Sequence, residues 1–364
     1  MKHNVLVVVD SFNGGAGNMA QILTQFLQKN KNNNVKLLLM NPNHSKSRYG
    51  FDQNDEKQAI YFHPGKAKKI AYIIKAIKFI RQVIKKYEID TVVSFLDNNN
   101  TIVGLSLFFN KKIRLIVSER SNPVVIPPSN KMWTILRRVA YRRANVVSVQ
   151  FDEFKVFDKG RFEKKCLETP NIILSSPYRR SVEQKDVIRF ISCARFAKIK
   201  RFDLLIELFA KIHEQNSNTE LVLCGDGPEK EKIINLINQY NLKDCVKLLG
   251  IVSNTYEVLK DCDIYLMTSL QEGFPNALSE AMASGLPAVV FKCHEGISKL
   301  VQNNVNGYCV NDKDCDKFIE KCVYLSLNYD LINKYGEESI KIANKYSPDK
   351  VLSIWESIIF EGNC

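Results

Sequence analysis

Strand-like and helix-like segments alternate along this chain twice over, and that alternation constrains the fold more than any other feature. Short runs rich in valine, isoleucine and leucine are separated by longer amphipathic segments. Such alternation is typical of a parallel, doubly wound α/β sheet, because a helix carries the chain back before the next parallel strand begins. The strand-like runs cover residues 5–10, 35–41, 90–96, 112–120 and 145–150, and then 187–196, 220–227, 245–250, 264–269 and 287–291.

Residues 169–186 interrupt this pattern. The segment contains two prolines with serines and charged residues and has little periodicity, so we expect a linker. The sequence therefore predicts two Rossmann-like domains, at 1–175 and 176–345, with a cleft between them. A terminal helix within 346–364 is expected to pack back on the first domain. Ligands of such folds bind at the carboxyl ends of the strands.

Composition argues against several classes of protein. Hydrophobic residues make up 45% of the 364 residues and charged residues 25%, as in an ordinary soluble globular protein. We expect no signal peptide, because the first apolar run ends at Asp10, and no stretch approaches the roughly 20 apolar residues of a membrane span. All ten cysteines lie between Cys166 and Cys364 without a C-x-x-C pair. Free thiols in a reducing cytoplasm fit this better than disulfides or a zinc site.

The formal net charge of +13 suggests an anionic partner, and nucleic acid, anionic membranes and phosphorylated substrates are all eligible. Positive charge is densest at 65–89, where the spacing predicts a helix with an isoleucine stripe and a separate lysine face. That face is either simply solvated or rests on anionic lipid, where each lysine contributes about 1 kcal/mol. Residues 137–143 would extend it. The residues are Ile70, Ile73, Ile74, Ile77, Ile80 and Ile84, with Lys68, Lys75, Lys78 and Lys85.

Two glutamates flank a turn within residues 270–291. Gly273 and Pro275 predict a helix that begins near Pro275, since proline suits the first helical position. Glu272 would then lie in the loop before the helix, and Glu280 in its second turn. Both carboxylates would border the amino-terminal end of that helix.

Arg195 and Lys200 follow the first strand of the second half. Two basic residues in a loop are usually solvated, but this loop should share a sheet edge with the glutamate-bearing turn. Arginine can bind a phosphate with two hydrogen bonds, lysine acts as a point charge, and the amides of Phe274 to Ala277 could hold the same phosphate. Carboxylates repel phosphate, so we expect them to accept hydrogen bonds from sugar hydroxyls. A nucleotide sugar has both a diphosphate for the cations and amides and sugar hydroxyls for the carboxylates.

A glycine-rich turn, "NGGAGN", follows the first strand. It lacks the spacing of a dinucleotide-binding fingerprint. Gly14 and Gly15 would nevertheless let the backbone approach a ligand at a helix amino terminus, and a tight turn without a ligand is the alternative.

Residues 272–289, "EGFPNALSEAMASGLPAV", resemble the two-glutamate signature of retaining GT-B glycosyltransferases, specifically glycosyltransferase family 4. The segment "ARFAKIKRFDLLIELF" resembles the arginine–lysine segment of that family, with Arg195 and Lys200 at its diphosphate-binding positions. The resemblance covers the second domain almost completely, and the first only by its layout and its "NGG" turn. Further similar segments are 169–171, 223–229, 248–254 and 295–310.

The resemblance implies a GT-B fold and transfer of a glycosyl unit with retention and without a metal or other cofactor. Glu272 would contact donor sugar hydroxyls, Glu280 the ribose, and Gly15 the diphosphate, with Arg195 and Lys200 as catalytic cations. The D-x-D-like segments 261–263 and 312–316 are expected to be a helix end and a helix start, not metal sites. Implied nucleotide-sugar contacts are Gly14, Gly15, Gly225, Val252, Gly273, Phe274, Pro275, Asn276, Ala277 and Glu280.

Two departures from the family pattern concern the first domain. Asn18 stands where many members have arginine, and "VSERSNP" at 117–123 lacks the histidine that many carry. "SERSNP" resembles a subgroup that builds bacterial surface polysaccharides and lipid-linked oligosaccharides, often from UDP-hexoses or UDP-N-acetylhexosamines. Glu119 and Arg120 are candidates for contacts with the donor sugar or the acceptor. The alternative is that they form a structural ion pair.

Together these features predict a cytoplasmic enzyme, peripheral to the inner face of the cytoplasmic membrane. It would move a hexose or N-acetylhexosamine from a UDP-sugar to a lipid-linked saccharide, with residues 65–89 on the anionic membrane surface. One alternative is a GT-B UDP-sugar epimerase. Another is a basic nucleic-acid-binding protein, which the charge alone suggests and the lack of interleaved aromatic residues disfavours. The sequence does not identify the transferred sugar, the nucleotide base, the linkage, the acceptor or the oligomeric state.

Overall fold

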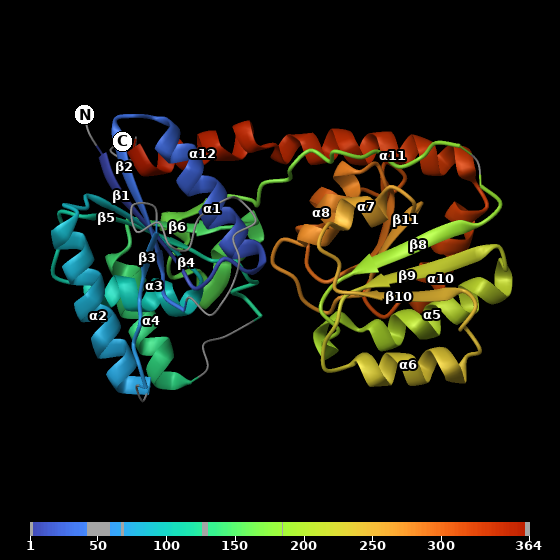
Figure 1. Ribbon diagram of the computed structural model, residues 1–364, viewed down its shortest axis with the longest axis horizontal. Coiled ribbons are helices and arrows are strands. Elements are labelled where there is room, and N and C mark those ends of the chain that lie inside the picture. The colour runs from blue at the N-terminus through green and yellow to red at the C-terminus, as the bar shows by residue number, and fades with distance from the viewer. Residues whose placement is uncertain (1–2, 42–58, 67–68, 126–129, 184, 361–364) are drawn as a thin grey trace. The chain divides into compact units, whose positions relative to one another are not determined.

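The computed structural model describes residues 3–41, 59–66, 69–125, 130–183 and 185–360 (Figure 1). They form two compact units, each built around a parallel sheet. Unit 1 comprises Met1–Ile172 with the C-terminal segment from Asp349, and unit 2 comprises Ile173–Pro348. The predicted pair of Rossmann-like α/β domains is therefore confirmed.

The sheet of unit 1 has seven strands in the order β3-β2-β1-β4-β5-β6-β7, and all its neighbours pair in parallel. Strand β1 is almost fully buried from Val5 to Val9, as expected when helices cover both faces of a parallel sheet. The strands are β1 His3–Val9, β2 Asn33–Leu39, β3 Ala59–Tyr61, β4 Thr91–Phe95, β5 Arg114–Ser118, β6 Val146–Val149 and β7 Cys166–Glu168.

The helices of unit 1 include the last helix of the chain. Trp355 of that helix, α12, is fully buried with its ring 5.6 Å from that of Phe95, and the Arg114 guanidinium donates to the carbonyl of Ile358 at 2.8 and 3.0 Å. Residues 361–364 of the predicted terminal segment lie outside the described residues. The helices are α1 Gly14–Lys29, α2 Lys69–Lys86, α3 Asp97–Ser106, α4 Lys131–Arg143 and α12 Pro348–Phe360, with short helices η1 Asp152–Gly160 and η2 Glu163–Lys165.

Helix α2 forms within the predicted segment, but only part of its isoleucine stripe is buried. Ile80 and Ile84 are buried, but Ile70 and Ile74 are 68% and 50% exposed. The reason is that the buried side chains of α2 begin only at Ala76, so the first turns do not reach the core. Lys68 lies outside the described residues.

The sheet of unit 2 has six parallel strands in the order β10-β9-β8-β11-β12-β13. Its core is aromatic and aliphatic, with Phe190, Phe209, Phe291 and Phe318 fully buried. The strands are β8 Ile188–Cys193, β9 Thr219–Cys224, β10 Val246–Gly250, β11 Ile264–Met267, β12 Ala288–Lys292 and β13 Gly307–Asn311. The helices are α5 Phe202–Gln215, α6 Lys230–Gln239, α7 Thr255–Leu259, α8 Asn276–Ala283, α9 Ile297–Leu300, α10 Cys315–Ser326 and α11 Tyr329–Ala343, with η3 Lys198–Lys200 and η4 Asn344–Tyr346.

Candidate active site

The strand order of unit 2 reverses between β8 and β11, which pair side by side. In open α/β sheets, ligands bind outside the carboxyl ends of the strands at such a switch point. Arg195 and Lys200 follow β8, and Glu272 follows β11. The topology therefore brings three of the predicted site residues to one place on the sheet edge.

The loops after β8 and β11 are tied together by hydrogen bonds. The hydroxyl of Thr268 donates to the carbonyls of Lys200 at 3.1 Å and Arg201 at 3.0 Å, and the amide of Leu270 donates to the carbonyl of Ile199 at 2.9 Å. Lys200 Nζ then lies 2.6 Å from Glu272 Oε1. Both side chains are partly shielded, at 22% and 14% exposure, so this ion pair is stronger than one in open solvent.

Arg195 contrasts with its neighbours. It lies two residues after β8, and its exposed side chain makes no hydrogen bond or ion pair within the described part of the chain. Arg189 and Arg201, which lie near it in sequence, pair with Glu220 and Asp312. The guanidinium of Arg195 is therefore available to bind a ligand.

Helix α8 begins at Asn276 with Pro275 as its N-cap residue, one position from the predicted start. No side chain caps it, and its first turn contains no acidic residue. The first amide bonded within the helix is that of Ser279, which donates to the carbonyl of Pro275 at 3.0 Å. The amides of Ala277 and Leu278 therefore have no partner within the helix, and they lie at the positive end of its dipole.

Glu272 lies in the loop before α8 and Glu280 in its second turn, as the glycine and proline pattern predicts. Oε2 of Glu280 accepts a hydrogen bond from the hydroxyl of Thr255 at 2.6 Å. Thr255 opens α7, after the loop from β10 that carries Val252. This contact joins the segment that follows β10 to the helix that follows β11, and it fixes the position of the Glu280 carboxylate.

Gly225 lies where β9 approaches the β8 exit. Its φ of +149° lies in the region that favours glycine, and a Cβ atom there would come within 1.9 Å of the carbonyl oxygen of Ala194. Its amide donates to the carbonyl of Gly250 at 2.7 Å. Gly225 thus allows three strand exits to converge, and its predicted contact with a nucleotide sugar stays a prediction.

The "NGG" turn occupies the corresponding place in unit 1, where the strand order reverses between β1 and β4. Gly14 has a φ of +72° and starts α1, which has no acidic residue in its first turn and no side-chain cap. Gly15 is the second residue of that helix. The turn has the geometry of a ligand-accessible helix amino terminus, and ligand contact by Gly14 or Gly15 stays a prediction.

Comparisons with known proteins fit this architecture. Residues 178–342, nearly the whole of unit 2, match the family model described as Glycosyl transferases group 1. The protein is a GT-B glycosyltransferase. The match covers the two loops and the helix that carry Arg195, Lys200, Glu272 and Glu280.

Relatives of this glycosyltransferase include enzymes of bacterial glycan assembly. It is 24% identical over 367 residues to the amylovoran biosynthesis glycosyltransferase AmsD of Erwinia amylovora, covering 98% of this chain and 99% of that one. It is 27% identical over 253 residues to the N-acetylgalactosamine-N,N'-diacetylbacillosaminyl-diphospho-undecaprenol 4-alpha-N-acetylgalactosaminyltransferase of Campylobacter jejuni, covering 65% and 66% of the two chains. The crystal structure of Anabaena HepE with UDP and glucose shares its fold, with a TM-score of 0.78, 16% identity, and coverage of 98% and 99%.

In unit 1 of the glycosyltransferase, Glu119 and Arg120 are buried, at 1% and 9% exposure. The Glu119 carboxylate accepts hydrogen bonds from Arg137 at 3.0 Å and from the Tyr141 hydroxyl, and no ion pair joins it to Arg120 in the described structure. Burial raises the pKa of Glu119, while the charge of Arg137 opposes that rise. The structural ion pair considered for Glu119 is thus made with Arg137.

Arg120 is surrounded by polar and aromatic groups. Its Nη1 donates to the carbonyl of Thr169 at 3.0 Å and to Oδ1 of Asn171 at 2.9 Å, and its guanidinium lies over the rings of Phe95 and Trp355. Burial lowers its pKa to about 9, although Glu119 opposes that change. The side chain joins strand exits of unit 1 to α12, and contact with a sugar or acceptor stays a prediction for both residues.

Two side chains at the site have no counterpart in the sequence prediction. Nε2 of His294 lies 3.1 Å from the carbonyl oxygen of Gly273, so it supports the turn beside Glu272. The neighbouring thiol of Cys293 has its pKa raised to about 12 by burial and by the charge of Glu272. Both follow β12. Their position directly after a buried strand, at this edge of the sheet, is the sequence signal that could have identified them as site residues.

The two D-x-D-like segments have structural roles. Asp263 is fully buried and pairs with Arg180 at 3.3 Å and Lys185 at 3.1 Å, while Asp314 caps α10 by accepting from the amide of Lys317 at 3.2 Å. In the described ranges, no three histidine, cysteine, aspartate or glutamate side chains gather as metal ligands. In those same ranges, every helix is too short or too polar to cross a membrane.

Proposed function

We propose that the protein is a retaining, metal-independent glycosyltransferase of family 4, which moves a hexose or N-acetylhexosamine from a UDP-sugar to a lipid-linked saccharide. The observation that carries this proposal is the Lys200–Glu272 ion pair, which lies at the switch point of unit 2 beside the unpaired Arg195. Positive and negative groups placed together in this way suit a ligand that joins a diphosphate to hydroxylated rings.

In this proposal unit 2 binds the donor, and its diphosphate lies at the amino terminus of α8. Arg195 can bind it with two charge-assisted hydrogen bonds, the amides of Ala277 and Leu278 supply further donors, and Lys200 supplies a point charge. Since Lys200 already pairs with Glu272, it can serve the carboxylate and the phosphate at once.

The two glutamates would bind the rings at either end of the diphosphate. Glu272 accepts from hydroxyls of the donor sugar while Lys200 fixes its orientation. Glu280, oriented by Thr255, accepts from the ribose. A charge-assisted hydrogen bond of this kind contributes roughly 1.5–3 kcal/mol. The backbone near Val252, in the loop that leads to Thr255, would contact the base.

The chemistry follows from where charge develops. The bond between the anomeric carbon and the phosphate oxygen breaks, and its electron pair stays on the departing diphosphate. Arg195, Lys200 and the α8 amides stabilise that charge, as preorganised donors do, so no metal ion is required for it. The acceptor oxygen bonds to the same face of the sugar, and its proton passes to the diphosphate.

Unit 1 would bind the acceptor at a membrane surface. Four apolar side chains in the first turns of α2 and α4 are solvent-exposed: Ile70 at 68%, Ile74 at 50%, Met132 at 60% and Ile135 at 59%. Both helices pack against α3, and Lys75, Lys78 and Lys131 are exposed on them. Apolar and basic side chains together suit an anionic membrane, and the Campylobacter relative is named for a diphospho-undecaprenol substrate.

A donor panel tests the proposed function. The enzyme is incubated with several UDP- and GDP-sugars, with and without a lipid-diphosphate saccharide acceptor and with EDTA present throughout. We expect release of UDP from one UDP-sugar, faster with acceptor, and an α-linked product from an α-linked donor. Conversion of a UDP-sugar into its isomer without acceptor would instead identify an epimerase. Loss of activity on chelation would contradict metal independence.

A further inference from the structure

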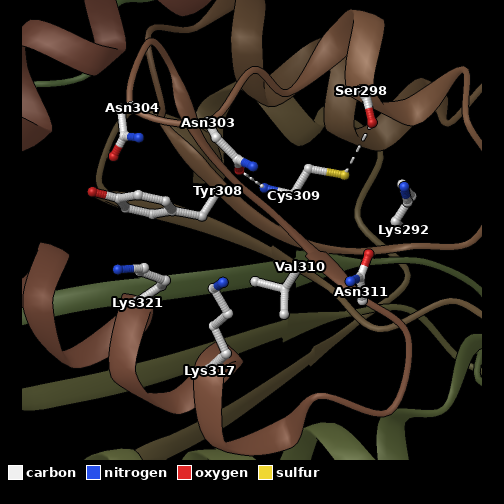
Figure 2. A pocket seen from close by; sticks show the side chains of 10 residues that line it. All are labelled: Lys292, Ser298, Asn303, Asn304, Tyr308, Cys309, Val310, Asn311, Lys317 and Lys321. Carbon is white, nitrogen blue, oxygen red and sulfur yellow. Dashed lines mark hydrogen bonds between the residues drawn. The ribbon is translucent and has the colours of Figure 1, made fainter.

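Unit 2 contains a second concave site, at the outer edge of its sheet and away from the switch point. It is a pocket of about 350 Å³ between the edge strand β13, helix α10 and the loops before β13 (Figure 2). Nothing proposed above occupies it. The lining residues most relevant to its chemistry are Lys292, Asn303, Asn304, Asn311, Lys317 and Lys321.

The lining is cationic. Lys292, Lys317 and Lys321 all contribute to it, and no described aspartate or glutamate lines the pocket. Lys317 is exposed, and its ammonium makes no hydrogen bond or ion pair in the described chain. Lys292 and Lys321 pair with Glu295 at 3.1 Å and Glu320 at 2.8 Å, and these carboxylates are 74% and 63% exposed. Such surface pairs contribute little, so an anion in the pocket can replace them.

Amide side chains line the opposite wall. Figure 2 shows Lys317 and Lys321 on α10 across the pocket from Asn303 and Asn304. Oδ1 of Asn303 accepts from the amide of Cys309 at 2.7 Å, which fixes the side chain. Its Nδ2 has no protein acceptor in the described structure and is available to a ligand. Lysine ammonium and asparagine amide groups together supply many donors, which suit phosphate oxygens and hydroxyls.

The size of the pocket narrows the ligand class. Small-molecule sites usually have volumes of roughly 300–1,000 Å³, so this pocket lies at the lower end of that range and exceeds the needs of a single phosphate ion. A phosphate attached to one sugar or polyol unit fits this volume, with its charge on the lysines and its hydroxyls on the asparagines.

The pocket walls continue into the loops of the donor site. Lys292 is followed by Cys293 and His294, and His294 contacts Gly273. Asn311, the register partner of Lys292 on the neighbouring strand β13, precedes Asp312, which binds Arg201 at 2.5 Å, and Arg201 follows Lys200. A ligand in this pocket would therefore lie against segments that also hold the Glu272 turn.

We propose that this pocket is a binding site for a phosphorylated saccharide, separate from the donor site. The proposal does not depend on the identity of the donor. It requires that a sugar phosphate bind the protein while the donor site is filled, and that binding depend on the lysines of α10.

The test is calorimetry on the full-length protein saturated with UDP, using N-acetylglucosamine 1-phosphate, inorganic phosphate and N-acetylglucosamine as three separate probes. We expect saturable binding of the sugar phosphate, about tenfold or more tighter than either other probe, because only it uses both sets of donors. Equal affinity for inorganic phosphate would overturn the saccharide part of the proposal. Absence of saturable sugar phosphate binding would overturn all of it.

Variants of the pocket lysines test whether the sugar phosphate binds in this pocket. The double variant Lys317→Gln/Lys321→Gln should weaken sugar phosphate binding about tenfold or more, because two of three lining cations are removed. Lys334→Gln on α11, which does not line this pocket, is the matched control and should bind unchanged. Affinity for UDP, measured first, reports whether each variant is folded. Unchanged sugar phosphate affinity in a double variant that still binds UDP would place the ligand elsewhere and overturn the proposal.

Discussion

Lys200 Nζ lies 2.6 Å from Glu272 Oε1, across the point where the strand order of unit 2 reverses. The two residues come from different strand exits and are 72 positions apart in sequence. A bound diphosphate would share Lys200 with Glu272, and it would meet the negative charge of that carboxylate close by. This relationship determines whether UDP binds more tightly or more weakly when Glu272 is replaced.

Replacing Glu272 by glutamine should separate turnover from nucleotide binding. We expect Glu272→Gln to lower kcat about 100-fold or more, because a charged contact to the donor sugar is lost. Affinity for UDP should stay equal or increase, since Lys200 is released and a nearby negative charge is removed. Steady-state kinetics and calorimetry measure the two effects. Glu207→Gln, an exposed glutamate on α5, is the matched control, and normal turnover in Glu272→Gln would remove Glu272 from the catalytic site.

Arg195 should contribute to UDP binding but not to the stability of the fold. Because its side chain has no partner in the described chain, Arg195→Ala should leave the melting temperature unchanged. UDP should bind about tenfold or more weakly, as expected for loss of a bidentate charged contact. Lys198→Ala, an exposed cation in the same loop, should bind UDP nearly as the wild type does. Equal losses in the two variants would mean that only general charge attracts the nucleotide.

Glu280 should recognise the ribose. Loss of one charge-assisted hydrogen bond predicts that Glu280→Gln weakens UDP binding by roughly 1.5 kcal/mol or more. The effect should largely disappear when the ligand lacks the hydroxyl that Glu280 contacts, so 2'-deoxy-UDP and 3'-deoxy-UDP are measured alongside UDP. If the substitution weakens all three ligands equally, Glu280 supports the loop through Thr255 and does not bind the ribose.

The thiol of Cys293 reports the charge of Glu272. Its pKa is raised to about 12 by burial and by Glu272, so the reactive thiolate is scarce at pH 9. Glu272→Gln removes the negative charge and should lower that pKa. Alkylation of Cys293 by iodoacetamide at pH 9, followed by peptide mass spectrometry, should therefore be faster in Glu272→Gln than in the wild type. Glu207→Gln is the control, and equal rates in all three proteins would contradict the coupling.

The exposed isoleucines of α2 should contribute to membrane binding. Ile70→Ser/Ile74→Ser should weaken binding to vesicles that contain anionic lipid by about tenfold or more, since burying each isoleucine side chain contributes roughly 1.5–3 kcal/mol. Leu327→Ser in unit 2 is the control, because that leucine is also exposed, at 65%. Vesicle cosedimentation in low and moderate salt measures the effect. Equal binding by the isoleucine variant would remove α2 from the proposed membrane surface.

The sequence predicted the fold well because alternation of apolar runs and amphipathic segments follows directly from a parallel sheet covered on both faces. It also placed Glu272 in a loop and Glu280 in a helix, because Gly273 and Pro275 are local signals. The order of strands is not local, so the switch point that joins the β8 and β11 exits emerged only from the structure.

Long-range pairing explains what the sequence could not predict. Thr255 and His294 reach the site from other strand exits, and no nearby residue marks them as partners of Glu280 and Gly273. Glu119 pairs with Arg137, eighteen positions away on α4, rather than with its neighbour Arg120. Helical periodicity identified the apolar face of α2, but it does not tell which turns the sheet covers, and Ile70 and Ile74 are exposed for that reason.

A crystal structure of the protein with UDP tests the central claim most directly. We predict that the diphosphate lies at the amino-terminal end of α8, within hydrogen-bond distance of the Arg195 guanidinium, Lys200 Nζ and the amides of Ala277 and Leu278, with the ribose against Glu280. Density for the nucleotide at any other place, with Arg195 and the first turn of α8 left in solvent, would contradict it.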